Sequence, residues 1–135
     1  MPGRPIQFRR AGGNAMLAKG RMRSGEMNGT EKRYAAVLDA RLHAGEVAWY
    51  AFESMTFKLA DDTRYTPDFA VMLMDGSFEL HEIKGGYAME DSVVKWKCAG
   101  EKFPFQFRMI WARKKADGGG WLVRTYGERD REICA

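Results

Sequence analysis

The sequence predicts one α/β domain in which a central mixed sheet is flanked by helices. Two helical segments stand among several extended runs, and no repeat with a period of about 20 to 50 residues is present. A length of 135 residues suits a single domain with a hydrophobic core. The 45% hydrophobic and 13% aromatic content excludes a disordered chain, because such chains lack the apolar surface that forms a core.

The first predicted element is a helix from about residue 29 to residue 44. Apolar residues recur there at steps of three and four: Tyr34, Ala35, Val37, Leu38 and Leu42. Gly45 supplies a stop. A run rich in aromatic residues, methionine and threonine, from Val47 to Leu59, then predicts a strand that ends at the cluster of residues 61–63.

Two further extended runs, residues 65–74 and 77–84, are joined at Asp75-Gly76 and predict an antiparallel hairpin. After Gly85-Gly86, either Asp91 or Ser92 can cap a second helix that ends near Gly100. Residues 105–113 and 121–126 predict two more strands, and the tail after them is expected to fray. The predicted order is α, β, β, β, α, β, β.

The positive charge of the chain is concentrated at its beginning. Residues 1–27 have no helical or strand periodicity and are expected to form a flexible basic arm, followed by the domain at 28–126 and a charged tail at 127–135. The arm carries cations and no acid before Glu26: Arg4, Arg9, Arg10, Lys19, Arg21 and Arg23. Together with a net charge of +4, this pattern favours an anionic partner such as DNA.

Several other classes of protein are disfavoured by the sequence. Cys98 and Cys134 lie far apart, and with His43 and His81 they form no pair at zinc-ligand spacing. No apolar run approaches the roughly 20 residues of a membrane helix, and the cationic start lacks the apolar stretch of a signal peptide. A protein of the cytoplasm without membrane contact is therefore expected.

The hairpin contains the residues that can carry chemistry, and its register decides whether they meet. A two-residue turn at Asp75-Gly76 sets Asp68 opposite Ile83, so that Asp68 and Glu82 project from opposite faces of the sheet. A three-residue loop of residues 74–76, with Gly76 left-handed, instead sets Asp68 opposite Glu82, with Cβ atoms about 5 Å apart. The second register is our prediction, because it also aligns apolar residues on one face for a helix to cover.

In that register, two carboxylates and an amine share one side of the hairpin. Glu82 and Lys84 point to one face, whereas Ile83 and His81 point to the other, where His81 is expected as a half-buried packing residue. Asp68, Glu82 and the backbone carbonyl of Ile83 are hard oxygen ligands suited to Mg²⁺ or Mn²⁺. Phosphodiester hydrolysis needs such a metal and a cation beside the attacking water, for which Lys84 is the candidate.

Glu31 is a candidate fourth member of the site. It lies one turn before Tyr34 and so shares the inward face of the first helix. If that helix covers the apolar face of the hairpin, Glu31 overhangs the carboxylates. The alternative is structural, because Asn28-x-x-Glu31 is close to a capping box, in which the glutamate accepts from the backbone of the cap residue.

From about residue 28 to residue 123 the chain resembles the PD-(D/E)XK nuclease superfamily. The resemblance is carried by Glu31, Pro67-Asp68 and Glu82-Ile83-Lys84 in that order, and by a restriction-endonuclease-like α-β-β-β-α-β core. Residues 28–34, 65–69 and 81–85 look like a small phage-encoded family within it, similar to Holliday-junction resolvases. This resemblance implies metal ligands at Asp68, Glu82 and Glu31, and a catalytic lysine at Lys84.

The resulting prediction is a Mg²⁺- or Mn²⁺-dependent DNA endonuclease acting in phage replication, recombination or packaging in a bacterial host. Lys95, Lys97 and the basic arm are candidate DNA contacts. A homodimer is expected, since one short chain carries one site and two strands must be cut. Duplex or branched DNA, DNA or RNA, and internal or end-directed cutting stay open, as do a non-catalytic DNA-binding module and a structural or host-interaction protein.

Overall fold

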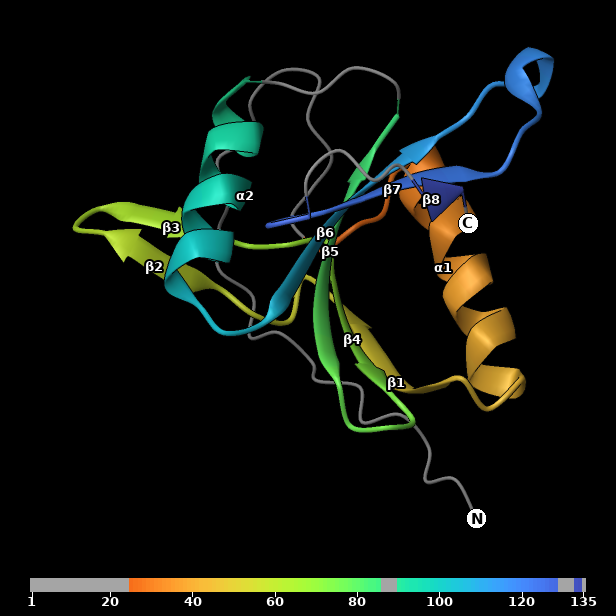
Figure 1. Ribbon diagram of the computed structural model, residues 1–135, viewed down its shortest axis with the longest axis horizontal. Coiled ribbons are helices and arrows are strands. Elements are labelled where there is room, and N and C mark those ends of the chain that lie inside the picture. Colours follow the sequence, from red (N-terminus) through yellow and green to blue (C-terminus); the bar gives the residue numbers. More distant parts are fainter. Residues whose placement is uncertain (1–24, 86–89, 129–132, 135) are drawn as a thin grey trace.

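The computed structural model describes residues 25–85, 90–128 and 133–134 of the chain. Within these ranges, six strands form one mixed sheet in the order β1-β4-β5-β6-β7-β8, and two strands form a separate hairpin, β2-β3 (Figure 1). The elements are α1 (Gly29–His43), β1 (Val47–Phe52), β2 (Phe57–Ala60), β3 (Thr63–Tyr65), β4 (Phe69–Leu73), β5 (Phe78–Lys84), α2 (Glu90–Lys102), β6 (Gln106–Ala112), the 3₁₀ turn η1 (Lys115–Asp117), β7 (Trp121–Thr125) and β8 (Ile133–Cys134).

The two helices lie on opposite faces of the sheet, as Figure 1 shows. On one face, α1 packs Leu38 against Phe69, Val71 and Ile83 of the central strands. On the other face, α2 and the β2–β3 hairpin cover a cluster that includes Leu80, Trp96, Phe107 and Met109. The predicted α/β class, with a mixed sheet flanked by helices, is therefore confirmed.

The first helix agrees closely with its prediction. It spans Gly29–His43, and Tyr34, Ala35 and Leu38 form its buried face. Its start is a capping box: the Asn28 side chain accepts from the Glu31 amide at 2.9 Å, and Glu31 Oε2 accepts from the Asn28 amide at 2.8 Å. Local sequence therefore determined the start of this element.

Two of the predicted strands are each divided in the structure. The run 47–59 forms β1 and β2, because Glu53 adopts a positive φ of 45° that turns the chain out of the main sheet. Of the run 65–74, residue 65 ends β3 and residues 69–73 form β4, with Thr66, Pro67 and Asp68 between them, since proline cannot donate to a sheet ladder. The prediction of one continuous strand was wrong in both places.

The second half of the chain follows the prediction with two corrections. The strands expected at 105–113 and 121–126 are β6 and β7, displaced by a residue at some ends. Helix α2 begins at Glu90, so Asp91 and Ser92 lie inside its first turn, and neither is the cap. Ile133 and Cys134 form β8 against β7, so this part of the tail is paired where fraying was expected.

The register of the β4–β5 hairpin is the three-residue-loop register. Phe69 pairs with His81, Ala70 with Leu80 and Met72 with Phe78. Leu73 and Ser77 close the loop, with the Leu73 amide donating to the Ser77 carbonyl at 2.9 Å. Gly76 has the left-handed φ of 87° that such a loop requires. The prediction on which the candidate site depends is confirmed.

The helix that covers the carboxylate face is not the first helix. The condition considered from sequence, that the first helix covers Ala70 and Leu80, is not met: α1 packs on the opposite face, and α2 with β2–β3 covers these two residues. Both faces of β4 and β5 are buried, as in central strands covered on two sides. Alternation alone therefore could not assign each helix to its face.

In the described part of the chain, neither helix is long and apolar enough to cross a membrane.

Candidate active site

Asp68 and Glu82 meet at the end of the β4–β5 ladder. Continuing the register of Phe69 and His81 by one residue sets Asp68 opposite Glu82. The Ile83 amide donates to Asp68 Oδ2 at 2.7 Å, and the Tyr65 hydroxyl donates to Glu82 Oε2 at 2.9 Å. Both carboxylates are thus held by donors from neighbouring segments, and Glu82 is only 7% exposed.

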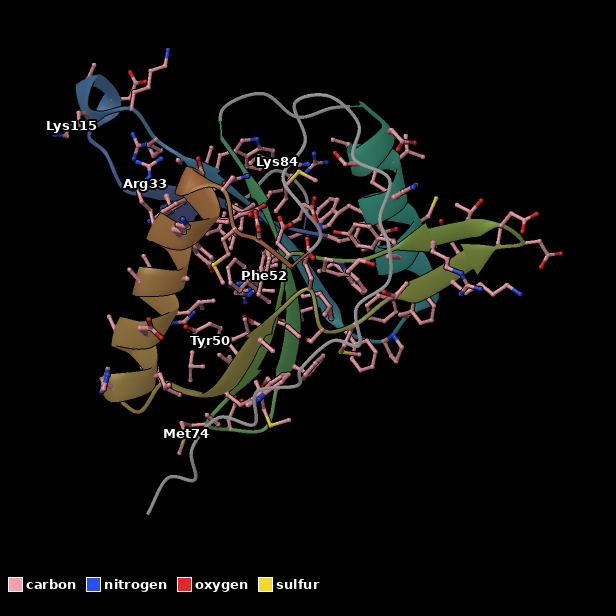
Figure 2. The ribbon with its side chains drawn as sticks, turned by 180° about the vertical axis from the view of Figure 1, so that it is seen from behind. Arg33, Tyr50, Phe52, Met74, Lys84 and Lys115 are labelled. Atoms are coloured by element: carbon pink, nitrogen blue, oxygen red, sulfur yellow. The ribbon has the colours of Figure 1, made fainter. Side chains whose placement is uncertain are left out.

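Lys84 lies beside Glu82 on the same face of β5. Its Nζ is 3.2 Å from Glu82 Oε1 and donates to Ser92 Oγ, on the first turn of α2, at 2.7 Å. Figure 2 shows Lys84 at the end of β5 away from the β4–β5 loop, which Met74 marks. The ammonium group is therefore held from two sides at the edge of the site.

Glu31 combines its capping role with a position at the site. Its carboxyl group accepts from the Asn28 amide, and it also interacts with Asp68, Lys84 and Glu53. Burial raises the pKa of Glu31 most, and the negative charge of Glu53 adds to that rise. The capping box and the site position, considered as alternatives from sequence, are both present.

Burial and neighbouring negative charge raise the pKa values of both carboxyl groups. Burial, followed by the charge of Glu82, raises the pKa of Asp68 to about 8, against the lowering effect of the Ile83 amide. Burial also raises the pKa of Glu82, although Lys84 and Tyr65 lower it in part. When fully ionised, the cluster would therefore carry more negative charge than its own donors compensate.

These residues fit a hard divalent cation. Carboxylate oxygens have two lone pairs each, so the donors at Asp68 and Glu82 leave acceptor capacity for a metal. The N–H and C=O of one strand residue point to the same side, so the Ile83 carbonyl opens on the side of Asp68. No group of three or more His, Cys, Asp or Glu side chains in the described ranges is arranged to hold a metal, so the fit rests on two carboxylates and this carbonyl.

Sequence reasoning missed three residues around the site. Tyr65 and Ser92 contact Glu82 and Lys84 directly, and Glu53 adds a further carboxylate from the end of β1. Ser92 was considered only as a helix cap, and Tyr65 only as part of a strand. A positive φ at a glutamate has no local sequence signal, so only the turn after β1 reveals Glu53.

Of the predicted DNA contacts, only Lys95 and Lys97 lie in the described part of the chain, both on α2, whose first turn contacts Lys84 through Ser92. The six arm residues Arg4, Arg9, Arg10, Lys19, Arg21 and Arg23 lie outside the described residues. Lys95 is 3.8 Å from Asp91, one turn earlier on α2, and Lys97 is exposed. Their role in DNA binding stays a prediction.

His81 lies on the opposite face from Glu82, as expected, but it is fully buried and not half-buried. The Tyr34 hydroxyl lies 2.7 Å from His81 Nδ1, and His81 Nε2 lies 3.0 Å from Glu79 Oε1. Arg108 pairs with Glu79 at 2.9 Å. Burial lowers the pKa of His81 most, against the raising effect of Glu79. His81 thus belongs to a polar network beneath α1.

Comparison with known proteins does not identify a relative. No protein-family model, no curated protein and no solved structure matches this chain. The case for a function therefore rests on the residues of the site and their geometry.

Proposed function

We propose that this protein is a divalent-metal-dependent deoxyribonuclease of the PD-(D/E)XK type. One observation carries the proposal: Asp68, Glu82, Lys84 and Glu31 come from three segments of the chain and converge at one end of the sheet. A helix-borne acid, two further acids and an amine, in this order along the chain, match the resemblance drawn from the motifs. The α/β sheet with helices on both faces is compatible with the restriction-endonuclease-like core.

Asp68, Glu82 and the Ile83 carbonyl are the residues that would hold Mg²⁺ or Mn²⁺, supported by Glu31. When bound, such a cation supplies positive charge at the scissile phosphate and lowers the pKa of a water molecule. Tyr65 keeps Glu82 oriented through its hydrogen bond to Oε2. The Ile83 amide does the same for Asp68.

Lys84 is the residue that would act on the reacting groups. Its ammonium is anchored by Glu82 and Ser92, so it presents a remaining donor in a defined direction. From there it can orient the attacking water and stabilise the negative charge that grows on the phosphate oxygens. This chemistry needs no serine or histidine nucleophile.

The substrate that best suits the proposal is duplex or branched DNA, cut by a homodimer. A single site on each chain cuts one strand, so two copies are needed for two strands. The resemblance to resolvase-like phage endonucleases favours four-way junctions and a role in phage replication, recombination or packaging.

Cleavage by the full chain tests the proposal directly. Duplex, nicked, flap and four-way DNA, with an RNA duplex for comparison, are incubated with Mg²⁺ or Mn²⁺ and with EDTA. We expect Asp68→Asn and Lys84→Ala to cut at least about 100-fold more slowly than wild type. Asp62→Asn and Lys58→Ala are matched controls, because both residues are exposed and lie on the β2–β3 hairpin.

The proposal is falsified if Asp68→Asn or Lys84→Ala cuts as fast as its control. A chain that binds DNA without any metal-dependent cleavage is instead a non-catalytic binding module. A chain that fails to bind DNA even at low salt, where electrostatic attraction is strongest, is neither.

A further inference from the structure

The loop between β6 and β7 is an ordered, cationic hairpin. Ala112 pairs with Trp121 at its base, and the Arg113 amide donates to the Gly120 carbonyl at 2.9 Å. The Arg113 guanidinium also bonds the Asp117 carbonyl across the loop. Lys114 and Lys115 are exposed at its start. The loop therefore presents two lysines from a braced backbone.

This hairpin starts next to the candidate active site. β5 and β6 are parallel, and Lys84 pairs with Trp111, so both strands end at the same edge of the sheet. Neighbouring strands are about 4.8 Å apart and rise about 3.3 Å per residue. Lys114, three residues beyond Trp111, therefore stands roughly 11 Å or more from Lys84, on the same side of the molecule.

The first turns of α1 connect the site to the hairpin. Thr30 lies against Gly85, which follows Lys84, and the Arg33 guanidinium lies 5.9 Å from the ring centre of Trp121 at the hairpin base. Lys32 and Arg33 are exposed there. Figure 2 shows Lys84, Arg33 and Lys115 toward the same end of the molecule, away from Met74. Exposed cations thus continue from the site outward in one direction.

We infer that the β6–β7 hairpin and the adjoining turn of α1 bind the DNA backbone that flanks the scissile phosphate. Lys114 and Lys115 contact phosphates, with Lys32 and Arg33 between them and the site. DNA rises about 3.4 Å per base pair, so a distance of 11 Å or more corresponds to about three to five base pairs from the cut. The inference rests on the proposed function, because it takes the scissile phosphate to lie at Lys84.

A charge-matched pair of variants tests the surface. Lys114→Ala/Lys115→Ala removes two cations from the hairpin, and Lys58→Ala/Arg64→Ala removes two from exposed positions on the β2–β3 hairpin. Figure 1 shows these two hairpins projecting on opposite sides of the molecule. Binding of labelled duplex DNA by the full chain is measured in EDTA over a salt series, and cleavage is measured with Mn²⁺.

We expect the hairpin variant to bind about 3- to 10-fold more weakly at about 0.1 M salt. Its plot of log Kd against log salt should be flatter by about 2, since each lost phosphate contact in B-DNA removes about 0.9. The control variant should change by less than about twofold. In cleavage, the loss should raise KM and leave kcat unchanged, because the lysines touch no reacting atom.

Shortening the duplex on one side of the cut locates the contact. We expect the difference in DNA affinity between wild type and the hairpin variant to disappear when fewer than about three base pairs remain on the hairpin side. A hairpin variant that binds like the control, or that loses the same affinity at every flank length, overturns the inference. If the wild-type chain never cleaves DNA, the nuclease proposal is refuted but the inference about the hairpin is not. The binding series in EDTA then still decides whether the hairpin binds the duplex.

Discussion

Replacing Asp68 with asparagine should stabilise the protein in the absence of divalent cations. Asp68 is buried against Glu82, and the two charges oppose one another. Asparagine has nearly the same shape, and its oxygen can still accept from the Ile83 amide, 2.7 Å from Asp68 Oδ2. The substitution therefore removes a buried charge while keeping the hydrogen bond that orients the side chain.

The size and pH range of the effect follow from the pKa of Asp68. That pKa rises from 3.8 to about 8 on folding, so the folded chain binds more protons than the unfolded chain between these values. Wild-type stability consequently falls as pH rises through this window, with the whole penalty present above about pH 8. At about 1.4 kcal/mol per unit the ceiling is about 6 kcal/mol. We expect the substitution to raise the free energy of unfolding by about 1–3 kcal/mol, because part of the repulsion in the cluster, that between Glu82 and Glu31, is left in the variant.

Thermal unfolding in EDTA between pH 4 and pH 9 measures this difference. For a chain of this size 1 kcal/mol corresponds to about 4 °C, so Asp68→Asn should melt about 4–12 °C above wild type near pH 8.5. The two should converge toward pH 4, where Asp68 is protonated in the folded chain. Added Mn²⁺ should raise the Tm of wild type and not that of the variant, because it binds the ionised cluster.

An Asp68→Asn protein that is no more stable than wild type at pH 8.5 would refute the reasoning. Asp62→Asn is the control, since Asp62 is exposed on a turn with a positive φ of 59°, which asparagine tolerates. A control that rises in Tm as much as Asp68→Asn would show that any lost acid stabilises this chain. The cluster at Asp68 would then need no special explanation.

Two further substitutions separate structural from chemical roles. Glu31→Gln keeps the acceptor of the capping box, so urea unfolding should give a free energy of unfolding within about 0.5 kcal/mol of wild type. The cleavage rate should fall at least about 10-fold. An unchanged cleavage rate would show that Glu31 acts only as part of the cap. Gly76→Ala should cost about 1–2 kcal/mol of unfolding free energy, because Gly76 has a φ of 87°, and the folded protein should keep its cleavage rate. If Gly76→Ala reduces the cleavage rate, the loop conformation determines the β4–β5 register, and the buried pair Ala70 and Leu80 does not suffice to keep it.

The parts of the fold that depend on short segments could be read from the sequence. Asn28 and Glu31 form the capping box that begins α1, and Gly76 supplies the left-handed residue of the hairpin loop. Asp75 adds a local bond, since its carboxylate accepts from the Ser77 amide at 2.8 Å. Each of these interactions lies within three residues along the chain, so residue type and spacing suffice to predict it.

The divisions within the predicted strands, and the helix that covers each face, depended on distant contacts. Glu53 adopts its positive φ where its amide donates to the Asp68 carbonyl at 2.7 Å, a contact between segments 15 residues apart. Ala70 and Leu80 pack under α2, although their alternation with Phe69 and Val71 suits either helix. The hydrophobic pattern of a strand indicates that both of its faces are buried. It does not indicate which element covers each face.

The sequence by itself determined that Asp68, Glu82 and Lys84 share a face, because strand alternation and the three-residue loop act over a few residues. Tertiary structure alone decided which groups surround them. Tyr65 comes from β3, Ser92 from α2 and Glu53 from the end of β1, and their meeting sets the hydrogen bonds and the raised pKa values of the cluster. Burial and charge coupling depend on distance in space, which spacing along the chain does not specify.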